Sequence, residues 1–342
     1  MGGRNLFRSH SCNERRITAL KKEKKKYAAV GGQALIEGIM MKGPKGAAMS
    51  VRLPNGEIET ELKHETPWRE KNAFFKLPLV RGIVGFVESM VTGYRYLMES
   101  AEKSTQGLEE DAENLSKVDR WINDHFGKKM MNAVGVVSAV LGFALAFFLF
   151  MWLPSFLVDV VTKNALLNYH ALFEGIIRVI IFIVYMLLVS QMKDIKRVFM
   201  YHGAEHKSIF CLENGLELTV ENVRKQRRFH PRCGTSFMFV MILLSILLSS
   251  ALVLIFPALA TVKRALWIAV KLLILPLVMG LGYEFIRYAG KHDNLLVKIF
   301  AAPGLWMQRI TTKEPTDDII EVGIAALKAV LDDETATGST AQ

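Results

Sequence analysis

The sequence predicts a mainly α-helical, polytopic membrane protein with about four transmembrane helices and a small N-terminal cytoplasmic module that contains β-strands. The 342-residue chain is 51% hydrophobic. Its mean hydropathy of +0.24 excludes a disordered, collagen-like or disulfide-scaffold protein. Four windows approach or exceed the roughly 20 apolar residues that a helix needs to cross a bilayer. These windows are residues 133–153, 173–192, 237–256 and 265–286.

Charged residues distinguish the four windows. The first and third carry no charge, so a buried helix of a soluble protein explains them poorly. The second contains Glu174 and Arg178, and the fourth contains Lys271 and Glu284. We expect these long side chains to reach the membrane interface. Glu284 is also a functional candidate, as an ionisable group at membrane depth. Its alternative role is an ion pair with Arg287. A pair with Lys271 is not expected, because thirteen residues, more than three helical turns, separate the two.

The distribution of Lys and Arg predicts the orientation, because positive charge stays on the cytoplasmic side of a membrane. The first 27 residues hold nine basic and two acidic residues, so seven of the ten net positive charges lie in this tail. The connection after the second window is also basic, whereas the one after the first has only Lys163. Lys263 and Arg264, in the third connection, are a minor exception. We expect both termini and the long second connection to be cytoplasmic.

Three cysteines, Cys12, Cys211 and Cys233, are too few and too scattered for a disulfide framework. We expect reduced thiols or metal ligands, and therefore a cytosolic environment. Small core residues are the alternative for Cys211 and Cys233. No signal peptide is expected, because no apolar segment follows the basic tail.

The chain divides into seven expected segments. Apolar and polar residues alternate from 47 to 65 around Asn55-Gly56, a pair that supplies the positive φ angles of a tight hairpin. Residues 34–36 and 39–41 are candidates for one or two further strands. The segments are a basic disordered tail (1–27), a β-hairpin-containing module (28–66), an amphipathic or interfacial helical region (67–132), a first transmembrane hairpin (133–192), a cytoplasmic connection (193–236), a second transmembrane hairpin (237–286) and an amphipathic C-terminal region with a tail (287–342).

Several segments outside the four windows have helical patterns. Residues 77–98 are apolar but contain three glycines and three charges, which predicts an interfacial or buried amphipathic helix instead of a span. Residues 295–310 predict a helix on the membrane surface and then a turn, because they contain Pro303-Gly304. Residues 317–331 have the pattern of a short amphipathic helix. The acidic residues 109–113 predict a solvated helix start, and residues 335–342 a disordered tail.

The sequence His202-Gly203-Ala204-Glu205-His206 directly follows the second window. If that helix continues, His202 and His206 lie one turn apart on the same face, where two imidazoles can hold one metal ion. Glu205 lies beside them and could act as general base on a metal-bound water. This H-x-x-E-H order matches the inverzincin pattern. The alternative is that interfacial histidines reach lipid or carbonyl groups.

A second group of ligand residues lies in the same connection. His230 and Cys233 are separated by two residues, and both residue types suit zinc. With the first pair they predict a tetrahedral site, whereas three ligands and an open position would leave room for a reactive water. A carboxylate ligand is a further alternative, because Glu213, Glu217 and Glu221 lie between the two groups.

The basic runs at residues 21–26 and 224–228 suggest two roles. They could hold anionic lipid headgroups, or they could serve only as the topology signal. Nucleic-acid binding is not expected, because aromatic residues do not interleave with these charges. Membrane lipid is therefore the expected partner, and the sequence identifies no protein partner.

At these residues the chain resembles the YqhQ-like family of bacterial membrane proteins, which are labelled predicted metal-dependent enzymes. The likeness extends from about Gly31 to about Leu331. Its motifs are Gly31-Gly32-Gln33-Ala34 with Glu37-Gly38, His202 to Lys207, Glu221-Asn222-Val223-Arg224, His230 to Thr235, Tyr283-Glu284, and Pro303-Gly304-Leu305-Trp306 with Gln308-Arg309. The resemblance implies a bacterial cell-membrane protein and strengthens the metal hypothesis, but it implies no substrate.

The sequence thus predicts a divalent-metal site, with zinc the expected ion, on the cytoplasmic membrane surface. His202 and His206 are the expected ligands, His230 or Cys233 completes the shell, and Glu205 is the expected general base. The expected reaction class is hydrolysis. The competing hypothesis is a non-catalytic membrane scaffold or assembly factor in which the same residues form a closed structural site.

Overall fold

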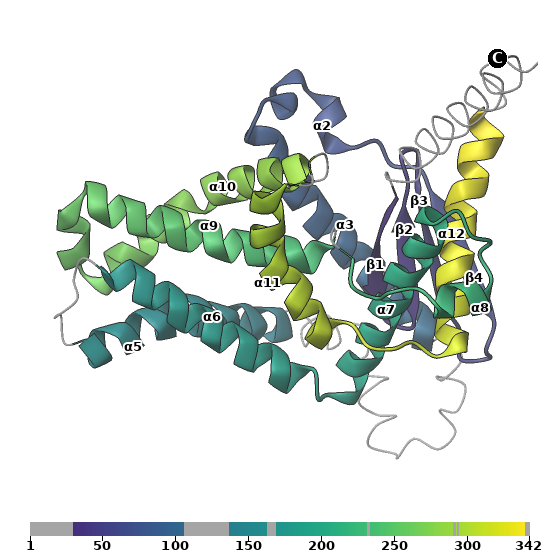
Figure 1. Cartoon of the computed structure of the whole chain (residues 1–342), viewed down its shortest axis with the longest axis horizontal. Helices are drawn as coiled ribbons and strands as arrows, with labels where there is room; N and C mark the ends of the chain where they lie inside the picture. The colour runs from purple at the N-terminus through teal and green to yellow at the C-terminus, as the bar shows by residue number, and fades with distance from the viewer. Residues whose placement is uncertain are drawn as a thin grey trace, which may run out of the picture.

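The computed structural model describes residues 30–105, 137–162, 169–230, 233–289, 292 and 294–338. The described chain has two parts, a bundle of long apolar helices and a sheet with helices on both faces (Figure 1). The expected basic tail and the acidic residues 109–113 lie outside the described residues.

The N-terminal strands form one antiparallel sheet in the order β1-β2-β3-β4. The predicted hairpin and the two further strands are confirmed. Gly56 in the hairpin turn has a φ of 90°, and Asn55 Oδ1 accepts the N–H of Glu57 at 2.9 Å. The strands are β1 (Gly31–Leu35), β2 (Gly38–Lys42), β3 (Ala47–Arg52) and β4 (Ile58–Lys63).

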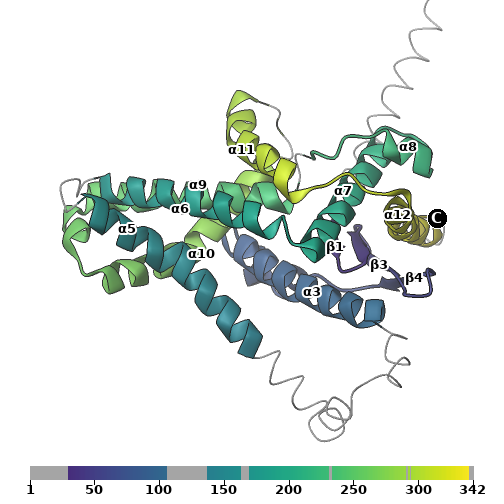
Figure 2. The same ribbon diagram turned by 90° about the horizontal axis from the view of Figure 1, so that it is seen from below.

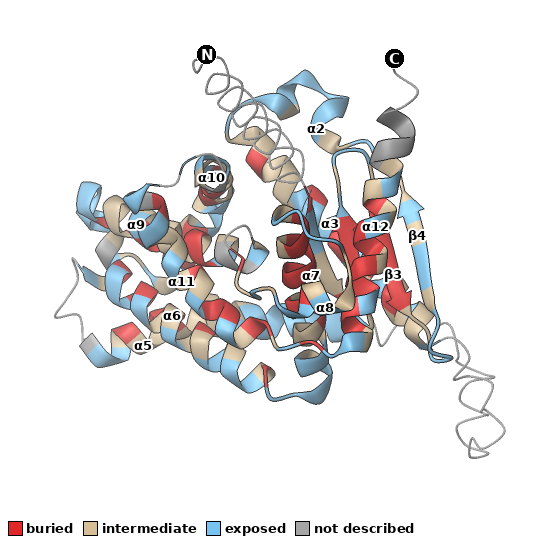
Figure 3. Cartoon of the chain, turned by 45° about the vertical axis from the view of Figure 1, so that its right-hand side comes forward, coloured by how far each residue is buried: buried red, intermediate tan, exposed pale blue. Residues whose placement is uncertain are grey.

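Helices cover both faces of this sheet. α7 (Lys193–Glu213) and α12 (Asp317–Gly338) lie on one face, and α3 (Val80–Thr105) lies on the other (Figure 2). The first face has a continuous core, whose buried positions Figure 3 shows along α7, α12 and β3. This core includes Ile39, Met41, Ala48, Tyr201, Ala204, Ile319 and Leu327. The sheet therefore shares its core with helices from the middle and the end of the chain.

Among the described residues, four helical stretches are long and apolar enough to cross a membrane, and they agree with the predicted windows. The stretches are Val137–Val161, His170–Val189, Phe237–Ile255 and Arg264–Ala289. The elements here are a π-helical turn η3 (Phe148–Trp152), α5 (Leu153–Thr162), α6 (His170–Val189), α9 (Gly234–Ile255), η5 (Pro257–Thr261) and α10 (Arg264–Ala289). The short elements elsewhere are α2 (Trp68–Lys71), η1 (Ala73–Lys76) and α8 (Val220–Arg224).

The second membrane helix does not continue into the histidine segment. α6 ends at Val189 and α7 begins at Lys193, because Met192 has an extended backbone with a ψ of 134°. The break allows α7 to leave the bundle and lie on the sheet (Figure 1). Both histidines of the motif still share one helix. Gly203 brings this helix close to the chain before α12, since an added Cβ would lie 2.1 Å from the Lys313 carbonyl oxygen.

The C-terminal region differs from its prediction in two places. α11 (Leu295–Thr311) continues through Pro303-Gly304, where a turn was expected, and it packs against α9. α12 confirms the predicted amphipathic helix. It runs to Gly338, beyond residue 335, where a disordered tail was expected to begin.

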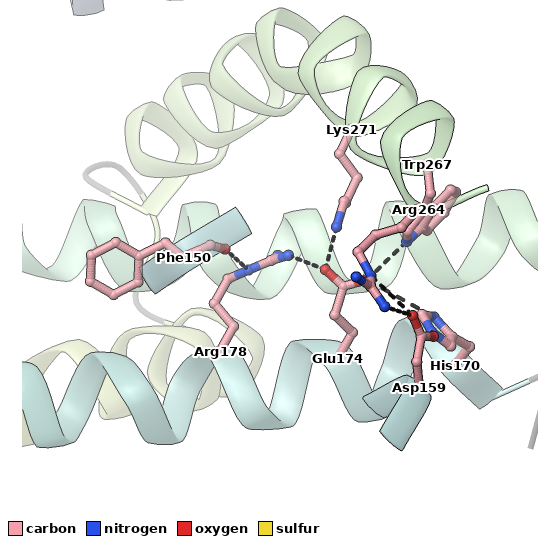
Figure 4. Close-up of polar contacts among 8 residues, drawn as sticks. All are labelled: Phe150, Asp159, His170, Glu174, Arg178, Arg264, Trp267 and Lys271. Atoms are coloured by element: carbon pink, nitrogen blue, oxygen red, sulfur yellow. Dashed lines mark hydrogen bonds and ion pairs between the residues drawn. The ribbon is translucent and has the colours of Figure 1, made fainter. Parts of the chain in front are cut away.

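Charged residues of the apolar helices form a buried network, although they were expected to reach the membrane interface (Figure 4). Glu174 of α6 is 1% exposed and Lys271 of α10 is 4% exposed. The Glu174 carboxylate accepts hydrogen bonds from Lys271, from Arg178 at 2.6 Å and from the Trp267 indole N–H at 2.8 Å. A buried carboxylate needs such partners, because its desolvation is costly.

Arg178 also satisfies a backbone carbonyl in this network. Pro154 has no N–H to donate to the Phe150 carbonyl four residues earlier. Arg178 Nε donates to that oxygen at 2.8 Å. The side chain therefore stabilises the π-helical turn as well as the carboxylate.

Two ion pairs connect further helices. Asp159 of α5 pairs with Arg264 of α10 at 2.7 Å. Glu284 pairs with Arg81 of α3 at 2.5 Å, and not with Arg287, the partner that its alternative role required. Arg81 and Glu284 are 203 positions apart in the sequence, and sequence spacing within one helix could not indicate this contact.

Candidate metal centre

Three of the predicted ligands converge where the bundle joins the sheet. His202 and His206 lie one turn apart on α7, and Cys233 directly precedes α9. One ligand atom from each residue lies within 4.8 Å of the other two. His202 Nε2 is 3.1 Å from Cys233 Sγ. Two imidazoles and a thiol from two different segments therefore point at one position.

Backbone carbonyls orient both imidazole rings. His202 Nδ1 lies 2.8 Å from the Thr311 carbonyl oxygen, and His206 Nδ1 lies 2.5 Å from that of Arg228. A ring nitrogen beside a carbonyl must carry the proton, which leaves Nε2 of each ring with its lone pair. This arrangement fixes the tautomer in which Nε2 faces the cluster, as in metal-ligating histidines.

His206 has a buried nitrogen without a hydrogen bond. The side chain is 1% exposed, and its Nε2 has no hydrogen-bond partner among the described residues. Such a buried polar atom costs about 1–3 kcal/mol if nothing satisfies it. Burial also lowers the pKa of His206, which favours the neutral imidazole. Neutral imidazole is the form that binds a metal ion.

Glu205 lies between the histidines and the sheet. It is 5% exposed, and burial raises the pKa of its carboxyl group. Its Oε2 lies 3.8 Å from His202 Nε2, and its side chain packs against the backbone of Gly32 in β1. Glycine is required at this point of the strand, because a Cβ on Gly32 would lie 2.7 Å from Glu205 Cγ.

His230 lies outside the group of three converging ligands. Its backbone is held by Gln308, which accepts the His230 N–H and donates to the His230 carbonyl, both at 2.7 Å. Its Nε2 lies 3.4 Å from the Glu213 carboxylate, and its ring centroid is 5.7 Å from that of His206. His230 therefore borders the cluster, and its predicted role as a ligand stays a prediction.

The other residues considered in the connection lie away from the cluster. Cys211, on α7, is fully buried in the core, which agrees with the alternative that it is a small core residue. Glu217 is exposed, and Glu221 pairs with Lys225 at 2.6 Å. In the basic run, Arg224 forms an ion pair with Asp317. One residue of this run therefore pairs with the start of α12, and the binding of the run to lipid stays a prediction.

Sequence reasoning missed the groups that orient the ligands. The carbonyls of Thr311 and Arg228 have no signature in the sequence, because every residue has a carbonyl. Gln308 and Gly32 belong to the motifs of the resemblance, but nothing in their spacing indicates that they contact His230 and Glu205.

Comparison with known proteins identifies the family. A family model described as a protein of unknown function (DUF1385) matches residues 77–333. This chain belongs to that family. The uncharacterized protein YqhQ of Bacillus subtilis (strain 168) is 34% identical over 310 residues, which cover 89% of this chain and 92% of the relative. No solved structure matches the chain.

The comparisons confirm the YqhQ-like family but not the label of a metal-dependent enzyme. The descriptions of the DUF1385 family and of the Bacillus relative mention neither a metal nor a reaction. Any chemistry assigned to this chain must therefore be argued from the geometry of its own residues.

Proposed function

We propose that this DUF1385 protein crosses the bacterial cell membrane four times, with both termini in the cytoplasm, and carries a hydrolytic zinc site at the inner membrane surface. The convergence of His202, His206 and Cys233 is the observation that carries the proposal. Charge placement supports the orientation, because the connection that contains these residues is the basic one.

The donor set fits zinc better than a hard cation. Imidazole nitrogen and thiolate sulfur are ligands that zinc prefers, whereas magnesium and calcium prefer oxygen. Both histidines reach the cluster through Nε2, with Nδ1 fixed by a carbonyl. Three protein ligands leave a fourth position open, which is typical of catalytic zinc sites.

Glu205 supports hydrolysis over simple metal storage. A bound divalent ion would supply a polarised water. Glu205 is positioned to take the proton of an attacking water, because its carboxylate lies beside His202 Nε2 and its side chain packs against Gly32. General-base help of this kind contributes typically about 10²–10⁴-fold in rate.

A closed structural site is the second candidate. The observation that favours it is the position of His230, whose ring lies beside that of His206. If His230 also bound the ion, it would be a fourth protein ligand and would leave no open position. The protein would then be a membrane scaffold or assembly factor.

Metal analysis of the detergent-purified protein tests the proposal. We expect about one zinc per chain in the wild type, and a loss of zinc in the His202→Ala, His206→Ala double variant. The matched control is the His64→Ala, His292→Ala double variant, which removes two histidines far from the cluster. Equal zinc in all three proteins would overturn the metal site.

Glu205→Gln separates catalysis from metal binding. The substitution keeps the size of the side chain but removes its ability to accept a proton. We expect the variant to retain zinc and to fail to restore the wild-type phenotype in a deletion strain. Full complementation by Glu205→Gln would exclude the hydrolase and favour the structural site.

A further inference from the structure

The candidate site lies against an edge of the sheet that no other strand of the described residues pairs with. β1 and β4 are the two edge strands, since the order is β1-β2-β3-β4. β1 is the edge that contacts α7, the helix of the metal ligands. An edge strand presents a row of backbone N–H and C=O groups that another extended chain can pair with.

Hydrogen bonds in the sheet establish which groups of β1 point outward. Arg52 N–H donates to the Glu37 carbonyl, and Gly43 N–H donates to that of Gly46, both at 2.8 Å. Odd-numbered residues of β2 therefore bond to β3, and its even-numbered residues bond to β1, because bonds alternate along an antiparallel strand. Their partners in β1 are Leu35, Gln33 and Gly31. This leaves the backbone groups of Gly32 and Ala34 on the outer edge.

Glu205 contacts β1 at one of these outward residues. An added Cβ on Gly32 would lie 2.7 Å from Glu205 Cγ and 2.9 Å from Glu205 Oε1. The proposed general base therefore lies beside the outer edge of β1. The adjacent outward groups are the Gly32 carbonyl and the N–H and carbonyl of Ala34.

Side chains leave this edge open. Gly32 is exposed and has no side chain, and Ala34 has only a methyl group. The Gln33 side chain lies on the other face of the sheet, where its Nε2 donates to the Gly93 carbonyl of α3 at 3.3 Å. A second backbone can thus approach β1 to the usual strand spacing of about 4.8 Å.

We propose that the outer edge of β1 binds an extended polypeptide by strand addition, and that a peptide bond of this polypeptide is the substrate of the site. The inference rests on the proposed hydrolytic function and names its substrate class. The added strand would run beside Glu205, within reach of the three converging ligand atoms. Backbone pairing makes binding depend on extended conformation more than on side-chain identity.

The reaction is hydrolysis of an amide. The water oxygen bonds to the peptide carbonyl carbon, and Glu205 takes the proton that the water releases. The carbon–nitrogen bond then breaks, and Glu205 returns the proton to the departing amine. The new carboxylic acid ionises, and the amine takes up that second proton. One water is consumed, and the products are a carboxylate and an ammonium group, with no oxidant or reductant.

Backbone chemistry favours a polypeptide over a lipid ester. The outward carbonyls of Gly32 and Ala34 need hydrogen-bond donors, and a peptide supplies an N–H at every second residue. A lipid ester has carbonyl acceptors but no N–H. It could satisfy the Ala34 N–H and would leave the two carbonyls unpaired.

Two hydroxamates test the proposal on the zinc-loaded protein in detergent. Acetohydroxamate binds zinc alone, whereas acetyl-Ala-Ala-Ala-hydroxamate adds a backbone that can pair with β1. We expect the peptide to bind at least about ten-fold more tightly to the wild type. Ala34→Pro removes an outward N–H without removing a bond of the sheet, and should bring the ratio of the two affinities close to one. Leu62→Pro, at an outward position of β4, is the matched control and should preserve the wild-type ratio.

The outcomes separate this inference from the proposed function. A wild-type ratio near one, or a ratio unchanged in Ala34→Pro, would overturn strand addition. Hydrogen exchange tests strand addition without zinc and without the Ala34→Pro variant. In the His202→Ala, His206→Ala protein, an acetyl-(Val-Thr)₃-amide peptide should slow exchange in residues 31–35 but not in residues 58–63. Protection of residues 31–35, together with a wild type that binds neither hydroxamate, would reject the metal site and support strand addition. If residues 31–35 are not protected, strand addition is overturned.

Discussion

Gly32 and Glu205 are in direct contact between β1 and α7, and this contact leads to a prediction at the scale of single residues. Gly32→Ala would place a methyl group 2.7 Å from Glu205 Cγ and 2.9 Å from the Met40 carbonyl oxygen. We expect it to displace the Glu205 carboxylate and to abolish complementation of a deletion strain, while zinc remains bound.

Gly31→Ala is the matched control for this variant. A Cβ at Gly31 meets no atom within 4 Å, so we expect full complementation. The contact would be irrelevant to function if Gly32→Ala complemented as well as Gly31→Ala does. Zinc analysis of both proteins shows whether any loss comes from Glu205 or from the ligands.

The sequence predicted the site best where neighbouring positions in one helix determine it. The spacing of His202 and His206 places both on one face of any α-helix, so their convergence followed from periodicity. Cys233 was found because its residue type suits zinc. The hydrogen bonds to the Thr311 and Arg228 carbonyls come from other segments, and no local pattern specifies them.

At the scale of elements, the buried network couples α6 to α10 through an unequal number of charges. Lys271 and Arg178 share the one carboxylate of Glu174. Removing Glu174 would leave two buried basic groups without their anion. Removing Lys271 would leave a balanced pair of Arg178 and Glu174. Removing Glu174 is therefore expected to cost more stability than removing Lys271.

We predict that Glu174→Gln destabilises the protein far more than Lys271→Met does. Breaking a buried ion pair by removing one partner costs about 3–5 kcal/mol, and we expect a loss in this range for Glu174→Gln. Thermal unfolding in detergent, followed by the circular dichroism of the helices, measures both variants. Equal losses of stability would contradict the charge count.

Local pattern predicted the elements but not their partners. The four apolar windows and the hairpin at Asn55-Gly56 were found because hydropathy and turn chemistry are local properties. The charged residues of the second and fourth windows were wrongly predicted to reach the membrane interface. Their partners lie on another helix, since Glu174 and Lys271 are 97 positions apart.

At the scale of the whole molecule, the first and last parts of the chain fold together. α12 covers the sheet formed by residues 31–63, and Arg52 donates to the Asp318 carbonyl at 2.6 Å and pairs with Glu321 at 2.9 Å. This packing requires both segments to lie on the same side of the membrane. It agrees with the charge distribution, which predicts that both termini are cytoplasmic.

Cysteine labelling tests this orientation. On a background with the native cysteines replaced by serine, a membrane-impermeant maleimide should label Val161→Cys in intact cells. Glu217→Cys should be labelled only after the membrane is permeabilised. Both native residues are exposed. Labelling of Glu217→Cys in intact cells would reverse the orientation and would place the thiol of Cys233 in an oxidising compartment.

X-ray absorption at the zinc edge tests the central claim most directly. The account predicts two nitrogen ligands at about 2.0–2.1 Å, one sulfur ligand at about 2.3 Å and one exchangeable oxygen for the zinc-loaded protein. Cys233→Ser should remove the sulfur, while the His64→Ala, His292→Ala variant should leave the spectrum unchanged. A spectrum without sulfur in the wild type, or one that Cys233→Ser does not alter, would contradict the proposed centre.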